Sequence, residues 1–203
     1  MLPTKTVRLN DSAPESSSRE DHQRPVEEGS PVGVMSEQEK PRVFTEHERL
    51  IVCAIAERIF PTTDSPGAVE IGALDYVETA LAGDYAAQAP LYRQGVRAVD
   101  RYARARFEKV FLRLTDAEKD AVLRDFEAGV PVFFKQAAEF FETLRYHVLE
   151  GVFCEPQYGG NKDMIGWRLV NFPGQQFGYD DAYVNRRVDL KPVSVDYRKN
   201  GTK

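Results

Sequence analysis

His147 and Glu150 are the residues whose types and spacing best suit acid–base or metal chemistry. They lie three positions apart within a helical pattern, which places both side chains on the same side of a helix, where they could hold a metal or move a proton. However, a catalytic metal usually takes three ligands from the protein, and the helix dipole alone favours a histidine near a helix C-terminus. The pair therefore favours a structural role, with catalysis as the alternative.

Nucleophilic and redox chemistry have weaker support. Cys154 has no histidine beside it in the sequence, although a neighbour in space stays open, and no G-x-S-x-G elbow exists. Cys53 and Cys154 form no C-x-x-C pair; a disulfide between them is possible, but two buried thiols are favoured, because free cysteine is a common core residue. Asp180 and Asp181 are adjacent carboxylates without an apolar wall to separate their pKa values. The sequence shows no recognisable catalytic apparatus.

The segment EPQYGGNKDMIGWRLVNFPG, residues 155–174, concentrates four glycines, two prolines and the only tryptophan. A dinucleotide site needs G-x-G-x-x-G between a strand and a helix, and a P-loop ends in Gly-Lys-Ser/Thr. This segment has neither spacing and follows a helical pattern. Gly159 and Gly160 are expected to supply positive φ in a tight turn, with Asn161 tolerating the same region. A structural loop is favoured over a phosphate cradle.

Helices must position these residues, and the sequence marks their ends. In TEHE, Thr45 is the expected N-cap and Glu48 reaches back to it, and TDAE repeats this capping box from Thr115. Pro61 ends the first helix, and Pro90 suits the first turn of the third.

The clearest helical pattern follows Pro131 and is expected to end at Gly151. Its apolar face consists of Phe133, Ala137, Phe140, Phe141, Leu144 and Val148. No alternation with period two precedes residue 165. The predicted fold is all-α, with about five helices in a compact single domain and an irregular Gly- and Pro-rich loop region at its C-terminal side.

Composition and charge narrow the partners. The chain of 203 residues carries 32 acidic and 27 basic side chains, a net charge of -5, and no basic cluster that would attract nucleic acid or anionic lipid. No apolar run approaches the roughly 20 residues that span a bilayer, so direct membrane insertion is not expected. Residues 1–43 are polar and predicted to be disordered, residues 44–174 form the helical domain, and residues 175–203 form an extended tail.

No export signal is recognisable. A basic start followed by an apolar stretch is missing, and the only adjacent arginines are Arg186 and Arg187. Met35 is an alternative start. On sequence alone the chain is expected in the cytoplasm, with co-export to the periplasm on a signal-bearing partner as the alternative.

Two stretches carry a resemblance to a known family. They are ERIFPTTDSPGAVEIGALDYVETAL and FFETLRYHVLEGVFCEPQYGGNKDMIGWRLVNFPG. The second contains F-F-x-x-L-R, E-G-x-F, P-x-Y-G-G-N, G-W and F-P-G in that order. This succession resembles the gluconate 2-dehydrogenase subunit 3 family, and the likeness runs from about Thr45 to Gly174.

The resemblance implies a non-catalytic small subunit of a sugar dehydrogenase complex. Such subunits bind a large FAD-dependent subunit of the glucose-methanol-choline (GMC) oxidoreductase type, often with a cytochrome c subunit that carries haem c. They typically bear a twin-arginine signal, escort the folded flavoprotein across the membrane and support its maturation. The resemblance therefore implies FAD and haem c on partner subunits and no cofactor on this chain.

The loop then becomes a candidate surface for the partner, because aromatic and arginine residues dominate binding energy at interfaces. A competing expectation is that Trp167 and Phe172 fold back and close the core. The tail could add an extended arm through Val188, Leu190, Val193, Val195 and Tyr197. A self-sufficient enzyme using His147 and Glu150, or a free-standing helical scaffold or regulatory module, is the alternative function. The predicted contact residues are Tyr158, Gly159, Gly160, Asn161, Trp167, Arg168 and Phe172.

Overall fold

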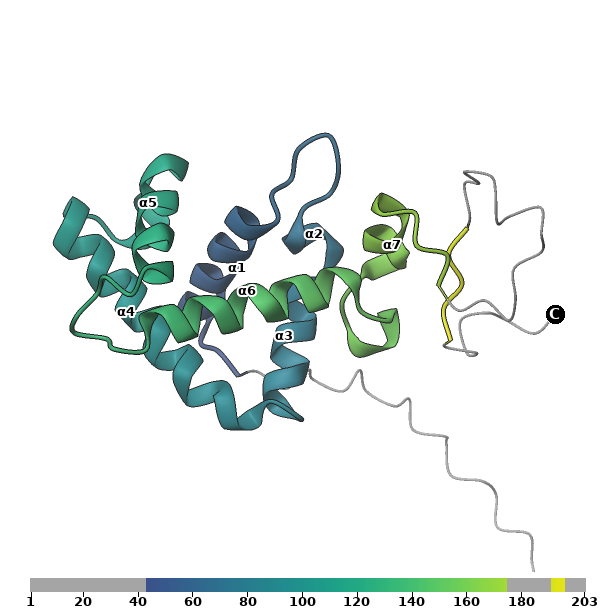
Figure 1. Cartoon of the computed structure of the whole chain (residues 1–203), viewed down its shortest axis with the longest axis horizontal. Coiled ribbons are helices and arrows are strands. Elements are labelled where there is room, and N and C mark those ends of the chain that lie inside the picture. The colour runs from purple at the N-terminus through teal and green to yellow at the C-terminus, as the bar shows by residue number, and fades with distance from the viewer. Residues whose placement is uncertain (1–42, 175–190, 196–203) are drawn as a thin grey trace, which may run out of the picture. The chain divides into compact units, whose positions relative to one another are not determined.

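Helices make up most of the part of the chain that the computed structural model describes, residues 43–174 and 191–195 (Figure 1). All described residues belong to one unit, Glu39–Lys203. They contain no β-strand, which confirms the predicted all-α class. The α-helices are α1 (Glu46–Ile59), α2 (Ala68–Ile71), α3 (Ala73–Ala82), α4 (Ala89–Phe107), α5 (Asp116–Glu127), α6 (Ala137–Phe153) and α7 (Ile165–Leu169).

Both predicted capping boxes are present. At the start of α1, the Thr45 hydroxyl accepts a hydrogen bond from the Glu48 amide at 3.2 Å, and the Glu48 carboxylate accepts one from the Thr45 amide at 3.0 Å. Thr115 and Glu118 make the same exchange at α5. Pro90 lies in the first turn of α4, as predicted. These local contacts satisfy amides that a helix N-terminus would otherwise leave unpaired.

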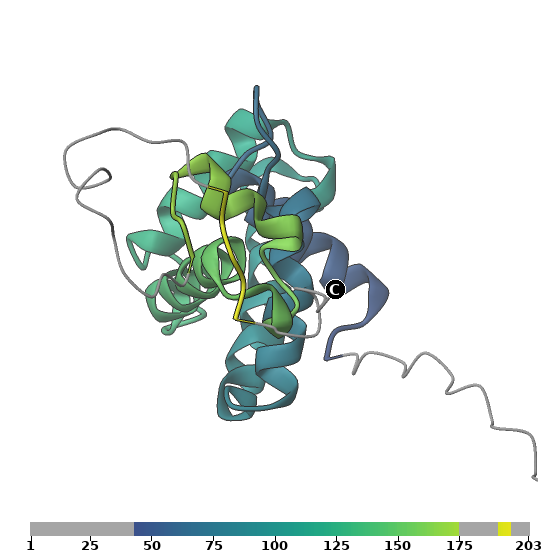
Figure 2. The same ribbon diagram turned by 90° about the vertical axis from the view of Figure 1, so that its right-hand side faces the viewer.

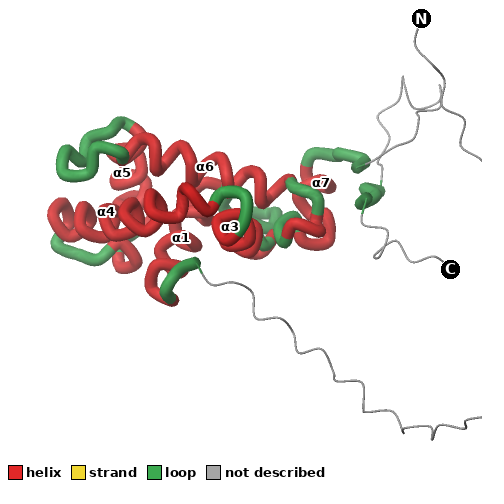
Figure 3. Tube along the Cα trace, turned by 90° about the horizontal axis from the view of Figure 1, so that it is seen from below, coloured by secondary structure: helices red, strands yellow, loops and turns green. Residues whose placement is uncertain are grey.

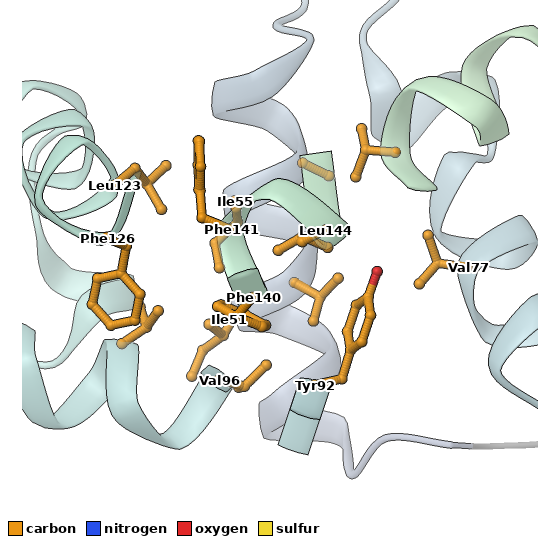
Figure 4. Close-up of a cluster of buried hydrophobic side chains, with 14 of the residues drawn as sticks. Ile51, Ile55, Val77, Tyr92, Val96, Leu123, Phe126, Phe140, Phe141 and Leu144 are labelled. Carbon is orange, nitrogen blue, oxygen red and sulfur yellow. The ribbon is translucent and has the colours of Figure 1, made fainter. Parts of the chain in front are cut away.

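Helix α6 is the central element of the fold. It packs most extensively on α3 and α5, and Figure 3 shows α1, α3 and α4 along one side of it. Its buried face contains the predicted apolar residues from Ala137 to Val148, without Phe133, and also His147, Gly151 and Val152. Figure 4 shows Phe140, Phe141 and Leu144 of α6 among side chains of α1, α3, α4 and α5: Ile51, Ile55, Val77, Tyr92, Val96, Leu123 and Phe126.

The predicted ends of α6 were wrong on both sides. The helix begins at Ala137, and Phe133 lies in the preceding turn, 39% exposed, with the Arg101 guanidinium carbon 4.2 Å from its ring centroid. The helix also runs through Gly151 to Phe153. Gly151 serves close packing instead of termination, because a Cβ there would lie 2.8 Å from the carbonyl oxygen of Ala73 in α3.

The structure has two α-helices more than predicted among its described residues. Helix α2 spans Ala68–Ile71, too few residues for a periodic pattern to show. Helix α7 lies inside the region predicted to be an irregular loop. Residues 61–67, between α1 and α2, are non-helical.

Part of the C-terminal region packs on the same loop. The Val193 amide donates to the Pro173 carbonyl at 3.0 Å, and Gly174 and Val193 form an isolated parallel bridge. Figure 2 shows the segment 191–195, in yellow, beside the α7 region. The predicted disordered extension and most of the predicted arm lie outside the described residues. No helix in the described part of the chain is long and apolar enough to cross a membrane.

Candidate functional site

Asn161 organises the loop that follows α6. Its side chain is fully buried. Its amide donates to the Gly151 carbonyl at 2.7 Å, and its Nδ2 donates to the Cys154 carbonyl at 2.8 Å. Its Oδ1 accepts from the Gly166 amide at 2.9 Å. One residue thus pairs carbonyls left open at the C-terminal end of α6 and holds the first turn of α7.

The two glycines before Asn161 differ in their roles. Gly159 has φ +99° and Asn161 has φ +43°, as the sequence predicted. Gly160 does not have positive φ, so that prediction was wrong. Position 160 needs glycine because the backbone packs closely there: a Cβ would lie 2.2 Å from the carbonyl oxygen of Gly151.

Several backbone amides of the loop are already paired within it. A phosphate cradle needs several backbone amides that point at the ligand. Here the amide of Gly159 donates to the Pro156 carbonyl at 3.1 Å, and the amides of Asn161 and Gly166 donate to the partners described above. The loop therefore uses these amides to hold its own structure.

Trp167 is folded back onto α6, which decides between the two expectations for its side chain. It is 5% exposed, and its indole Nε1 donates to the Phe153 carbonyl at 2.7 Å. Phe172 packs edge-on against it, with ring centroids 5.1 Å apart, and remains 46% exposed. Phe153, Trp167, Val170 and Phe172 line an apolar hollow of about 360 Å³, here called the α7 surface. Val170 is 58% exposed.

A larger recess of about 640 Å³ lies next to the α7 surface. We call it the Glu150 groove; its walls include Tyr76, Tyr85, Phe153, Cys154 and Tyr158 besides Glu150 itself. The Tyr76 hydroxyl donates to Glu150 Oε2 at 2.9 Å, and the Tyr85 hydroxyl donates to Oε1 at 3.4 Å. Burial and the adjacent carboxylate raise the pKa of both phenols, so they stay protonated donors.

His147 is nearly fully buried behind Tyr85. The two rings stack with centroids 4.5 Å apart and an interplanar angle of 2°, and the His147 Nδ1 is 2.8 Å from the Tyr92 hydroxyl. Burial lowers the pKa of His147, while Glu150 acts in the opposite direction. The ring is therefore neutral at physiological pH and fixed on two sides.

Cys154 is not activated. Burial raises the pKa of its thiol to about 11, whereas a nucleophilic cysteine needs a lowered pKa. Cys53 and Cys154 are both free thiols. Within the described ranges, no group of three or more His, Cys, Asp or Glu residues is placed to hold a metal ion. The geometry thus brings Glu150 and Cys154 to one groove, where the Cys154 thiol stays protonated.

A comparison with known protein families shows to which family this chain belongs. The model of the family described as gluconate 2-dehydrogenase subunit 3 matches residues 46–174. The chain belongs to the gluconate 2-dehydrogenase subunit 3 family. No curated protein and no solved structure matches. The match begins at the first residue of α1 and ends at Gly174, so it includes the seven α-helices, the loop and the α7 surface. Membership indicates an accessory subunit of a gluconate dehydrogenase complex.

In this gluconate 2-dehydrogenase subunit 3 protein, the predicted contact residues fall into two groups. The side chains of Tyr158, Arg168 and Phe172 are exposed, as is the backbone at Gly159. The others, Gly160, Asn161 and Trp167, are buried and hold the loop from inside. Contact with a partner stays a prediction for the exposed group.

Sequence reasoning missed Tyr76 and Tyr85 as parts of the groove. Tyr76 is 74 positions from Glu150, and Tyr85 is 65 positions from it, so no local spacing connects them. The one sequence signal for this contact was Gly83, a residue type that often ends a helix. In the structure Gly83 ends α3, and the Tyr85 amide donates back to the Ala80 carbonyl of that helix.

Proposed function

We propose that this chain is the non-catalytic small subunit of a flavin-dependent sugar dehydrogenase and that it binds and stabilises a large FAD-dependent subunit of the GMC type. The observation that carries the proposal is the family match, which spans the helical domain from α1 to Gly174. In this proposal FAD lies on the large subunit and haem c on a third, cytochrome subunit. Oxidation of the sugar and transfer of its electrons take place on those partners.

The α7 surface is the proposed contact with the large subunit. Contiguous exposed apolar side chains on a soluble protein mark interaction sites, and Val170 and Phe172 supply such a patch. The hydrogen bond from Trp167 Nε1 to the Phe153 carbonyl fixes the floor of the hollow, so little conformational entropy is lost on docking. Tyr158 and Arg168 extend the exposed set at the same loop.

Stabilisation of the large subunit follows from mass action. A protein that binds only the folded form of its partner adds free energy of unfolding in proportion to the logarithm of its concentration over Kd. The small subunit would thereby support maturation of the flavoprotein and accompany it as a folded complex during export.

Co-expression with a GMC-type flavoprotein tests the proposal. The flavoprotein should co-purify with the wild-type chain and should lose FAD or aggregate when expressed without it. A partner-free, monodisperse chain with no affinity for the flavoprotein would overturn the proposal.

The contact surface needs a matched pair of variants. Val170→Asp places a charge on the α7 surface, and Val132→Asp places one at an 86% exposed valine in the turn before α6. Val170→Asp should abolish co-purification, and Val132→Asp should leave it intact. The reverse pattern would move the contact to the turn before α6.

A further inference from the structure

The Glu150 groove combines a fixed carboxylate with aromatic walls. Two tyrosine hydroxyls donate to Glu150, one to each carboxylate oxygen, and the exposed phenol of Tyr146 also faces it, so the side chain is held in place. One face of Tyr85 is covered by His147, and the phenol forms part of the groove wall. Tyr158, 55% exposed, stands at the same groove.

No described residue that lines this groove balances its negative charge. None of the side chains that line it is Lys, Arg or His, and Glu150 forms no ion pair with any described residue. Elsewhere in the described part of the chain, partly buried carboxylates do have cationic partners. These pairs are Glu48 with Arg97, Glu78 with Arg49, Asp100 with Arg104, Glu118 with Lys109, Asp120 with Arg58 and Asp125 with Arg106.

We propose that the Glu150 groove binds the guanidinium group of an arginine side chain that belongs to the large subunit. This inference rests on the proposed function, because it names what that partner inserts. A planar guanidinium can donate two parallel hydrogen bonds to a carboxylate and stack on a phenol ring, which a lysine ammonium cannot do as well. The fixed Glu150 carboxylate can accept the two hydrogen bonds, and the aromatic walls of the groove offer a ring for stacking.

The groove is continuous with the α7 surface. Phe153 lines both recesses, and its ring is held edge-on by Phe60, with centroids 6.0 Å apart and an interplanar angle of 89°. A single partner can therefore cover the apolar hollow and place an arginine in the groove. This arrangement has the composition of a protein interface, with an apolar centre and a charged anchor at its side.

A titration of the full chain isolates the chemistry of the groove. The probe is Nα-acetyl-arginine methylamide, and its control is the citrulline analogue, which keeps the shape and loses the charge. In NMR spectra, the arginine probe should shift signals of Tyr76, Tyr85 and Glu150 and saturate in the millimolar range, and the shift should weaken with salt. Equal shifts with citrulline, or none with either probe, would overturn the proposal.

Two variants of α6 provide the matched comparison. Glu150→Gln keeps the shape of the side chain and should weaken the arginine probe about fivefold. Glu142→Gln removes an exposed carboxylate that pairs with Arg145 on the same helix, and it should change nothing. Equal affinity of the wild type and Glu150→Gln would contradict the assignment.

The chain's own Arg186 and Arg187 are the competing source of a guanidinium, because they lie in the sequence between the bridged residues Gly174 and Val193. If the probe binds only after both arginines are replaced by glutamine, the groove is filled by its own chain and the assignment to a partner is wrong.

The complex provides the second arm. Glu150→Gln should reduce co-purification of the flavoprotein, and Glu142→Gln should not. If both variants co-purify as the wild type does, the arginine anchor is wrong while the proposed function stands. If even the wild type fails to co-purify, the proposed function fails, and the titration alone judges the groove.

Discussion

Replacement of Asn161 by alanine is the most direct test of how the loop is held. The substitution removes two hydrogen bonds of a buried side chain, one to the Cys154 carbonyl and one from the Gly166 amide. It also forces alanine into the left-handed region at φ +43°. Because Asn161 joins the end of α6 to the start of α7, we expect α7 to detach before the rest of the domain unfolds.

The magnitude follows from these two losses. Each unpaired buried group costs on the order of 1 kcal/mol. A non-glycine residue in the left-handed region costs roughly 1 kcal/mol more. Asn161→Ala should therefore lower the free energy of unfolding by about 3 kcal/mol, or the Tm by about 10 °C for a domain of this size. Asn161→Gly removes the hydrogen bonds without the backbone strain, so its loss should be about 2 kcal/mol.

Trp167 provides the readout, because it is the only tryptophan and its indole is anchored on α6. In urea titrations of Asn161→Ala, its fluorescence should change at lower denaturant than the far-ultraviolet circular dichroism does. A loss under about 1 kcal/mol for Asn161→Ala, with both signals changing together, would refute the role assigned to this residue.

Three further outcomes follow from the geometry. Lowering the pH through 6.5, the ordinary pKa of histidine, should destabilise the fold, because His147 then binds a proton in the unfolded chain but stays neutral when buried. The free energy of unfolding, measured by urea titration at several pH values, should depend less on pH in His147→Gln. Cys154 should react with iodoacetamide at neutral pH roughly a hundredfold more slowly than a free cysteine, measured by mass spectrometry in a Cys53→Ser background; fast labelling would contradict its raised pKa. Gly151→Ala should cost about 2 kcal/mol in thermal unfolding, because its Cβ meets the backbone of α3.

Local patterns predicted the features that local contacts create. The capping boxes at Thr45 and Thr115 join residues three positions apart, so the sequence alone identified both helix starts. The apolar face of α6 followed from its period. Phe133 continues that spacing but lies outside the helix, where it contacts Arg101 of α4, and no local spacing connects these two residues.

The site was less accessible to prediction. The Gly-Gly-Asn signal indicated a turn correctly, but the partners of Asn161 lie on α6 and α7, and no spacing rule connects them. A single indole gives no periodic pattern, so the sequence does not decide whether the Trp167 side chain is buried. In the structure its Nε1 donates to the Phe153 carbonyl. Tyr76 and Glu150 meet only because α3 packs on α6.

The shared wall at Phe153 has a consequence for how a partner would be released. Two modest contacts on either side of one rigid ring act as a linked pair: once the first is made, the second forms as an intramolecular step at a high effective concentration. The affinity of the two linked contacts far exceeds the affinity of either contact alone. When one contact is lost, most of this added affinity is lost with it. A chemical change at either recess would then suffice to separate the subunits.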